Sequence, residues 1–340
     1  MTEQPELQAP SPGAPTQRPP RSEPAESTSE TTPRTHAVDT AVLPNVVDSP
    51  TEPPPSLVEL ARRYGLRPAD ARPRPVAYLG QLWRYRQFIA AYANGRTIAA
   101  FGESRIGRYW QLLTPLVNAG VYFLIFGIIL DTRRGMDNFI GYLCVGLFVF
   151  SYTQNVISAA VQSISAQLGL VRAIQFPRAS LPIAMTLVQV EALVGSMVVL
   201  SGIMIATREP VTLRWLWLVP ALALQTVFNL GVSLVMARLG ARIVDLKHLI
   251  PYLTRTWMYG SGILYSVEVF AKHLPGWAIA IVHANPLLVY IELARYALMT
   301  EAPLASTFRE LWIMGGAWAA VAAVFGFVYF WAGEPEYGRG

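Results

Sequence analysis

The chain has 340 residues, of which 53% are hydrophobic and 14% are charged, and it is therefore more apolar than an ordinary soluble domain. The formal net charge is +5, but the basic residues flank long apolar runs, so anionic lipid is expected as their partner and nucleic acid is not. The single cysteine, Cys144, excludes an intrachain disulfide and a cysteine zinc site.

Residues 1–56 are predicted to form a disordered cytoplasmic tail. Residues 1–55 contain half of the 26 prolines and many Ser, Thr and Glu, but no Phe, Tyr or Trp. Such a segment buries too little apolar surface to offset the entropy of ordering it. It also lacks the basic and apolar regions of a secretory signal.

Residues 57–109 form a second predicted region, at the membrane interface. From residue 78 to residue 108, aromatic and aliphatic side chains are interleaved with arginines, as in Trp83, Arg84, Tyr85 and Arg86. This stretch is too charged to span, and its mixture suits a helix that lies in the headgroup layer. A cytoplasmic helix packed on a partner protein is the alternative, and both can hold.

Residues 110–340 are predicted to form a membrane domain of six spanning helices, because a span needs roughly 20 mostly apolar residues. Backbone groups find no water in the hydrocarbon, so runs of this length must be helical. The predicted fold class is therefore an all-α membrane protein. The runs are Leu112–Leu130, Phe139–Ile157, Leu181–Ile205, Trp215–Met236, the more polar Leu249–Phe270, and Leu311–Trp331.

Lysine and arginine near the span ends predict the orientation, since these residues are enriched on the cytoplasmic side. More of them lie on the inner side when the N-terminus is inside, although the bias is modest. The sequence thus predicts a multi-pass plasma-membrane protein with its N- and C-termini in the cytoplasm. Its longest outer segment then lies between spans five and six.

Motifs for catalysis are absent from the sequence. It has no Gly-x-x-x-x-Gly-Lys-Ser/Thr phosphate loop, no Gly-x-Ser-x-Gly elbow and no histidines at metal-ligand spacing. We therefore expect a protein that is not an enzyme, hydrolyses no ATP itself and holds no metal or cofactor. Any energy must come from an ion gradient or from a partner.

Five weak motifs occur in order from about residue 80 to the end. They are Tyr85, Arg86 and Gln87 leading to Gly107, Trp110, Leu113 and Pro115; Leu168, Val171, Ile174, Phe176, Pro177, Arg178, Leu181 and Pro182; Arg242, Asp245 and Leu246; Asn285, Pro286 and Arg295; and Glu336, Tyr337 and Gly338. On a frame of six spans, this order resembles the permease subunits of ABC-2 type exporters of bacterial surface polysaccharides.

The resemblance implies a homodimer of this chain with two copies of a separate ATPase, which would bind the ATP and magnesium. It implies outward transport, across a bacterial plasma membrane, of a polysaccharide on a polyprenyl lipid, of O-antigen, teichoic acid or galactan type. The alanine-, arginine- and proline-rich composition makes galactan a guess among these substrates. The alternatives are an ABC-2 exporter of drugs or small lipids, a membrane-bound glycosyl- or acyltransferase, and a gradient-driven transporter.

The link after the second span is the first candidate for contact with the ATPase. In it, Arg172, Phe176 and Arg178 offer an aromatic anchor and two charges, and Pro177 stiffens the backbone. Arg242 and Asp245 belong to the corresponding loop after span four. An ordinary positively charged cytoplasmic loop is the alternative to an ATPase-coupling role.

A polar stripe on the second span predicts a path for sugars. Ser151, Asn155, Ser158 and Gln162 follow one another at helical spacing on one face. Aromatic rings suited to the apolar faces of sugars come from spans one and five. They are Tyr122, Phe126, Tyr252 and Tyr259. Hydrogen bonds between helices and interfacial belting are the alternatives.

Glu191 is predicted to lie near the centre of the third span, where an ionised carboxylate is costly. A place on the translocation path with a proton-coupling role is the functional interpretation. The structural interpretation, which we favour, is a neutral acid bonded to Asn118, Asn155 or Asn229 of a neighbouring helix.

The outer segment between spans five and six is the candidate outer gate. Two short apolar stretches are separated by Asn285 and Pro286, and Arg295 follows. Neither stretch is long enough to cross, so two half-helices that re-enter from outside are predicted. An amphipathic cap lying flat on the outer surface is the alternative.

Overall fold

The computed structural model describes residues 56, 59–60, 63–64, 74–102, 113, 116–118, 120–129, 138–264 and 275–334. The chain divides into two units, residues 1–66 and 67–340. In the first unit, the backbone N–H of Leu60 donates to the carbonyl of Ser56, and that of Tyr64 donates to the carbonyl of Leu60, as in helical turns. The predicted tail lies outside the described residues except for Ser56.

Every regular element among the described residues is helical, which confirms the all-α fold class. The elements are α2 (Pro75–Arg84), α3 (Arg86–Gly102), the π-helix η1 (Phe123–Ile129), α5 (Phe139–Gln162), η2 (Ser165–Gln167), α6 (Leu168–Ala173), α7 (Ser180–Ala206), η3 (Leu213–Trp217), α8 (Leu218–Arg242), α9 (Leu246–Tyr259), α11 (Gly276–His283), α12 (Pro286–Leu298) and α13 (Phe308–Ala332).

Four helical stretches are long and apolar enough to cross a bilayer: α5, α7, the continuous stretch η3–α8, and α13. They correspond to the predicted second, third, fourth and sixth spans. Each helical stretch is longer than its predicted apolar run. A multi-pass membrane protein therefore follows from the described part of the chain.

The predicted first and fifth spans differ from these four. The first is described only in part, with an apolar helix over Leu116–Ile125 that runs into η1. In the fifth, α9 has 14 residues and ends at Tyr259, a length of about 21 Å that is short of a hydrocarbon core of about 30 Å. Residues 265–270 lie outside the described residues, so the six-span count stays a prediction.

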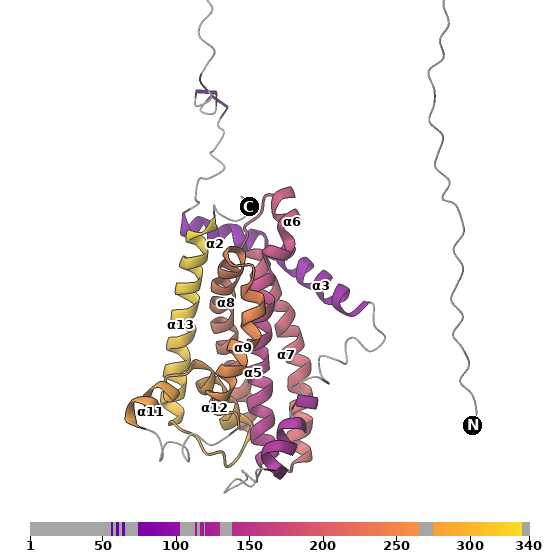
Figure 1. Cartoon of the computed structure of the whole chain (residues 1–340), viewed down its shortest axis with the longest axis vertical. Coiled ribbons are helices and arrows are strands. Elements are labelled where there is room, and N and C mark those ends of the chain that lie inside the picture. The colour runs from indigo at the N-terminus through magenta and orange to yellow at the C-terminus, as the bar shows by residue number, and fades with distance from the viewer. Residues whose placement is uncertain are drawn as a thin grey trace, which may run out of the picture. The chain divides into compact units, whose positions relative to one another are not determined.

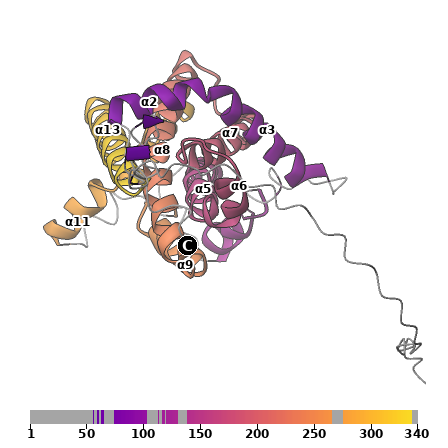
Figure 2. The same cartoon turned by 90° about the horizontal axis from the view of Figure 1, so that it is seen from above.

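The bundle has two ends, which we call the α2 end and the α12 end. At the α2 end lie α2, α3, α6, the α8–α9 link and the last described residues after α13; α11 and α12 lie at the opposite end (Figure 1). Seen from above, α2 and α3 follow one side of the bundle, beside α13, α8 and α7 (Figure 2). The α3 helix packs directly on α7.

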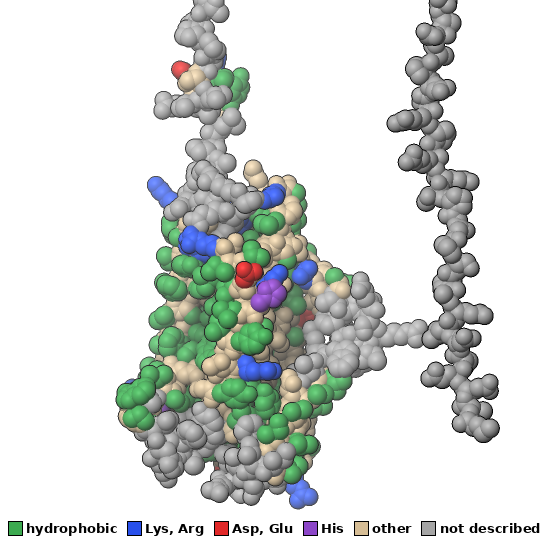
Figure 3. Space-filling view, in the orientation of Figure 1, with side chains coloured by type: hydrophobic (Ala, Val, Ile, Leu, Met, Phe, Trp, Pro, Cys, Tyr) green, Lys and Arg blue, Asp and Glu red, His purple; other side chains and the backbone are tan. Residues whose placement is uncertain are grey.

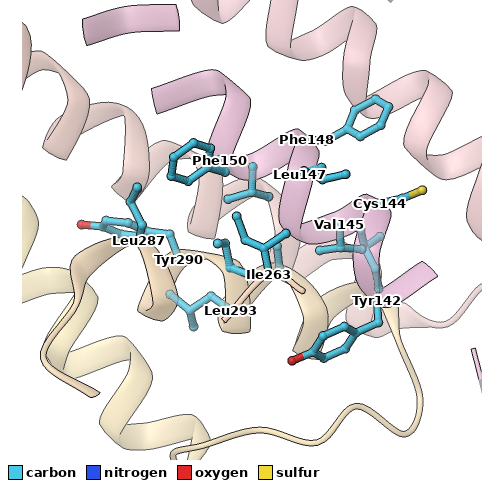
Figure 4. Close-up of a cluster of buried hydrophobic side chains, with 14 of the residues drawn as sticks. Tyr142, Cys144, Val145, Leu147, Phe148, Phe150, Ile263, Leu287, Tyr290 and Leu293 are labelled. Atoms are coloured by element: carbon cyan, nitrogen blue, oxygen red, sulfur yellow. The ribbon is translucent and has the colours of Figure 1, made fainter. Parts of the chain in front are cut away.

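The main core surrounds α5 and α12 near the α12 end. Figure 4 shows Phe150 of α5 close to Leu287 and Tyr290 of α12, with Ile263 from the turn after α9 between the two helices. Along α12 every residue from Leu287 to Leu298 except Tyr296 is buried. A flat cap would leave one face open, so this burial favours insertion of α12 into the bundle. In contrast, α11 is exposed, as Trp277 at its start shows.

The α8 and α13 helices pack with their backbones in contact. A Cβ atom at Gly231 of α8 would overlap the carbonyl of Ala322, and one at Gly326 of α13 would overlap the carbonyl of Gly231. Small residues allow this approach in membrane bundles, where packing replaces the hydrophobic driving force. The two helices therefore form a rigid pair.

Candidate functional site

The link between α6 and α7 is held by a cluster of side chains at the α2 end. The Tyr78 hydroxyl of α2 donates to Glu334 Oε2 at 2.7 Å and accepts from the backbone N–H of Ala179 at 3.1 Å. The backbone N–H of Arg178 donates to Glu334 Oε1 at 3.1 Å, and the Arg178 guanidinium donates to the Glu334 carbonyl. Glu334 is half-buried, and burial raises the pKa of its carboxyl.

Phe176 and Pro177 of the same link also face the protein. The Phe176 ring lies 5.1 Å from the Phe88 ring of α3, and Pro177 is buried. The Tyr85 hydroxyl donates to the carbonyl of Gln175 at 3.4 Å. The aromatic anchor and one of the two charges predicted for an ATPase therefore have partners within this chain.

Other side chains of the two links at the α2 end lie on the surface of the chain. Arg172 is exposed on α6, and Ile174 beside it is 52% exposed. Arg242 and Asp245 are exposed in the α8–α9 link, which also presents Val244 at 63% exposure. Both links thus combine charged and apolar surface.

The polar stripe of α5 lies on the outward face of the chain. Asn155 and Gln162 are exposed and Ser151 and Ser158 are half-buried, whereas the opposite face of α5 is buried. The buried face supplies the hydrogen bonds between helices, and in one of them Gln225 of α8 donates to Thr153 at 3.0 Å. Bonding between helices therefore belongs mainly to residues other than the stripe.

The α9 helix presents a second polar and aromatic face. Tyr252, Tyr259 and Arg255 are exposed there. Tyr122 lies close enough to Tyr259 and Arg255 to interact with them electrostatically. Figure 3 shows charged side chains gathered over α9. Gln154 of α5 donates to Thr254 of α9 at 3.3 Å, so α5 and α9 are adjacent. The side chain of Phe126 lies outside the described residues.

Glu191 does not bond to any of the three asparagines that we predicted as its partners. Its carboxylate accepts a hydrogen bond of 3.1 Å from Thr97 of α3 instead, and Glu191 itself is exposed. The prediction of a specific asparagine partner was wrong because α3, and not another spanning helix, covers this part of α7. The path and proton-coupling interpretations stay predictions.

Asn285 and Pro286 lie at the start of α12, and Asn285 also forms hydrogen bonds with residues at and just after the end of α9. Asn285 caps α12 by accepting from the backbone N–H of Leu287 at 3.1 Å, and Pro286 takes the first helical position. The Asn285 oxygen also accepts from the Trp257 indole at 3.0 Å, and its amide donates to the Ser261 hydroxyl at 3.1 Å. One side chain thereby fixes the two elements together.

Arg295 is fully buried at the same end. It donates to the carbonyls of Gly262 at 3.1 Å and of Tyr142 and Ile263 at 3.3 Å, and it stacks on the Tyr142 ring. Gly262 has φ 62°, a conformation that glycine adopts without strain. Arg295 therefore holds the turn after α9 against α5, and a direct role in gating stays a prediction.

The interface residues of α2 and α3 lie on the surface as their composition suggests. Trp83 is 71% exposed, Arg84 and Tyr85 are exposed, and the Arg86 guanidinium lies 5.4 Å from the Trp83 ring. Val76, Leu79 and Trp83 form one exposed apolar face of α2. Contact with lipid headgroups or with a partner protein both fit this face.

Tyr78 and Glu334 are the site residues that sequence reasoning missed. Tyr78 lies on the side of α2 opposite the exposed apolar face. This position on the helix is the feature of the sequence that could have identified Tyr78 as a site residue. Of the two acids after the last span, sequence reasoning favoured Glu336, which lies outside the described residues.

Comparisons with known proteins identify the family. The family model described as ABC-2 type transporter matches residues 87–299. The chain is 22% identical over 188 residues to the O-antigen export system permease protein RfbA of Myxococcus xanthus, covering 55% of this chain and 72% of that protein. It is 24% identical over 189 residues to RfbA of Klebsiella pneumoniae, covering 55% and 70%.

A second kind of relative has a different name. The chain is 24% identical over 200 residues to the polysialic acid transport protein KpsM of Escherichia coli, covering 58% of this chain and 76% of that protein. The family match runs from α3 through α12 and so includes both links, the polar stripe and the buried Arg295. The chain belongs to the ABC-2 type transporter family.

Proposed function

We propose that this chain is the permease of an exporter that moves a lipid-linked polysaccharide outward across a bacterial plasma membrane. The observation that carries the proposal is the exposed polar face of α5 and α9 within helices of a membrane domain. The names of the relatives, which refer to O-antigen and polysialic acid, support a polysaccharide as substrate. They lend no support to galactan.

A second copy of the chain is the proposed cover for this face. Asn155 and Gln162 carry amides that hydrocarbon cannot satisfy, so protein or water must lie against them. Two copies facing each other would place two polar stripes and the rings of Tyr252 and Tyr259 around one path. Amides suit sugar hydroxyls, and aromatic rings suit the apolar faces of sugars.

We place the α2 end in the cytoplasm, together with both chain termini. Arg172, Arg178, Arg242 and Lys247 lie at the α2 end, as the enrichment of basic residues on the inner side requires. At the α12 end, Trp217 packs on Phe308 and Trp312 with ring centroids 5.5 and 5.6 Å apart. Such aromatic clusters suit a membrane–water boundary.

Energy is proposed to come from a separate ATPase, two copies of which bind ATP and magnesium. Its docking surface on this chain would be Arg172, Ile174, Val244 and Asp245, because these side chains are exposed on the two links. Phe176, Pro177 and Arg178 then act from within this chain, as supports of the link.

The six-span count and the outer gate are part of the same proposal. The partly described segment before α5 would supply the first span, and the region from α9 to α12 would supply the fifth with two re-entrant half-helices. Asn285 and Arg295 would hold those half-helices across the exit of the path.

Affinity purification of the tagged chain from membranes in mild detergent tests this proposal. We expect a stoichiometric ATPase to co-purify, and its yield to fall about tenfold in the double variant Arg172→Glu/Ile174→Asp, since interface residues of this kind carry about 1.4 kcal/mol. Val211→Asp, at an exposed apolar position near the α12 end, is the control and should leave the yield unchanged. Recovery of the wild-type chain alone would contradict the proposal.

A further inference from the structure

The carboxyl group of Glu334 lies where three parts of the chain meet. It follows the end of α13, accepts from Tyr78 of α2, and accepts from the backbone N–H of Arg178 in the α6–α7 link. Two of the donors on the link are backbone groups, of Arg178 and Ala179, and the third is the Arg178 guanidinium, which donates to the Glu334 carbonyl. The backbone donors mean that the cluster fixes the course of the chain itself.

The start of α7 depends on these contacts. Ala179 precedes the helix and provides no side-chain cap. The Glu334 carboxylate and the Tyr78 hydroxyl accept from the backbone N–H groups of Arg178 and Ala179, the two residues just before the helix, where the positive end of the helix dipole favours a negative group. The position of α7 is thereby tied to residue 334 and to α2.

An apolar layer supports the hydrogen bonds from the bundle side. Tyr78 is 1% exposed and packs in a cluster with Ile164, Ala179, Leu234 and Phe330, which come from the turn after α5, the link, α8 and α13. Because α8 and α13 touch through their backbones at Gly231 and Gly326, Glu334 stands at the end of a rigid pair.

We propose that Glu334 and Tyr78 are positioning residues that latch the α6–α7 link to the α8–α13 pair, so that a displacement of the link moves that pair together with α7. This rests on the proposed function, in which an ATPase displaces the link. The latch stays closed through the transport cycle. Without the latch, a displacement of the link by the ATPase would bend the link and would not move the α8–α13 pair.

The test is export per ATP hydrolysed, measured with the complete permease–ATPase complex. ATPase turnover is measured on the purified complex, and export is measured as the share of newly made, isotope-labelled polysaccharide that reaches the cell surface. We expect Glu334→Ala to keep complex yield and ATPase turnover within about twofold and to lower export per ATP about tenfold, the scale of a typical coupling between sites.

Graded variants separate positioning from mere folding. Tyr78→Phe removes one bridge and should lower export per ATP less than Glu334→Ala does. Glu334→Gln keeps one oxygen acceptor and should recover part of the loss. Glu301→Ala, an exposed acid near the α12 end, is the control. Unchanged export per ATP in Glu334→Ala, or a fall of export only in proportion to complex yield, would overturn the latch.

A covalent bridge keeps the test decisive if Glu334→Ala does not fold. In the double variant Arg178→Cys/Glu334→Cys, a short bifunctional thiol reagent can join the two positions, and the one native cysteine, Cys144, is 4% exposed and out of reach. We expect the bridged protein to export and the unbridged one to be uncoupled. Export blocked by the bridge would overturn the latch, whereas a wild-type complex without ATP-dependent export would reject the proposed function instead.

Discussion

The α5 and α13 helices are both of membrane-spanning length, but their free surfaces differ. In their most apolar stretches, 72% of α5 and 22% of α13 is buried. What α13 leaves exposed is apolar, including Val321 at 59% and Val324 at 65%, whereas α5 exposes Asn155 and Gln162. Figure 3 shows the apolar covering of α13 beside the charged surface over α9.

This difference shows which side of the molecule lipid can cover. Hydrocarbon accepts the valines of α13 without cost but cannot satisfy the amides of α5. Mean hydropathy separates the most apolar stretches of the two helices only modestly. The identity of the exposed residues is therefore more informative than the hydropathy of the whole helix.

The largest expected effect comes from the inner face of α13. Gly326→Ala should destabilise the protein by about 3 kcal/mol, because the new methyl group would overlap the backbone of α8 and cannot move aside. Thermal unfolding in detergent, followed by size-exclusion chromatography, measures the change. Gly316→Ala on the same helix meets no atom within 4 Å and should leave the melting temperature unchanged. Equal melting temperatures for the two variants would show that α8 and α13 do not touch.

A charge placed on each outer face tests the contrast between lipid and water directly. Val321→Lys on α13 should cost about 2–3 kcal/mol and lower the amount of folded protein in membranes, since lysine would face hydrocarbon. Asn155→Lys on α5 should be tolerated, because its side chain would enter a wet path. Quantitative blotting of membrane fractions provides the comparison, and similar losses at the two positions would remove the distinction between the faces.

Asn155→Leu makes α5 resemble α13 and should separate stability from transport. We expect unchanged thermal stability, because Asn155 is exposed in the chain, and export reduced about tenfold, since the sugar path loses a hydrogen-bonding group. Val321→Leu is the control and should export normally. If Asn155→Leu exports as well as the control, the stripe does not line the path.

The spans of α5, α7, α8 and α13 could be predicted because apolar length alone determines them. The end of α9 could not, since the apolar run continues past Tyr259 while Gly260 and Gly262 turn the chain back toward Arg295. Hydropathy counts residues along the chain and gives no weight to a turn of this kind.

The link was predicted as a functional element, but its partners were not. Arg178 and Glu334 are 156 residues apart, and Thr97 and Glu191 are 94 apart, so no local pattern joins them. A basic residue in a short link suggests an outside partner as readily as an inside one. Only the packing of α2 and α13 on the link decides between the two.

The smallest effect is expected for a hydroxyl group on the lipid face. On α7, Ser196 and Ser201 donate to the carbonyls four residues earlier, at 3.0 and 2.8 Å, so a serine can satisfy itself on its own helix. Val321→Ser should therefore cost less than about 1 kcal/mol in thermal stability, whereas Val321→Asn should cost more, because its amide has more groups than the helix can satisfy. Equal costs would contradict this reasoning. In that case the exposed amides of Asn155 and Gln162 would be no stronger evidence for a water-filled path than the hydroxyls of Ser151 and Ser158.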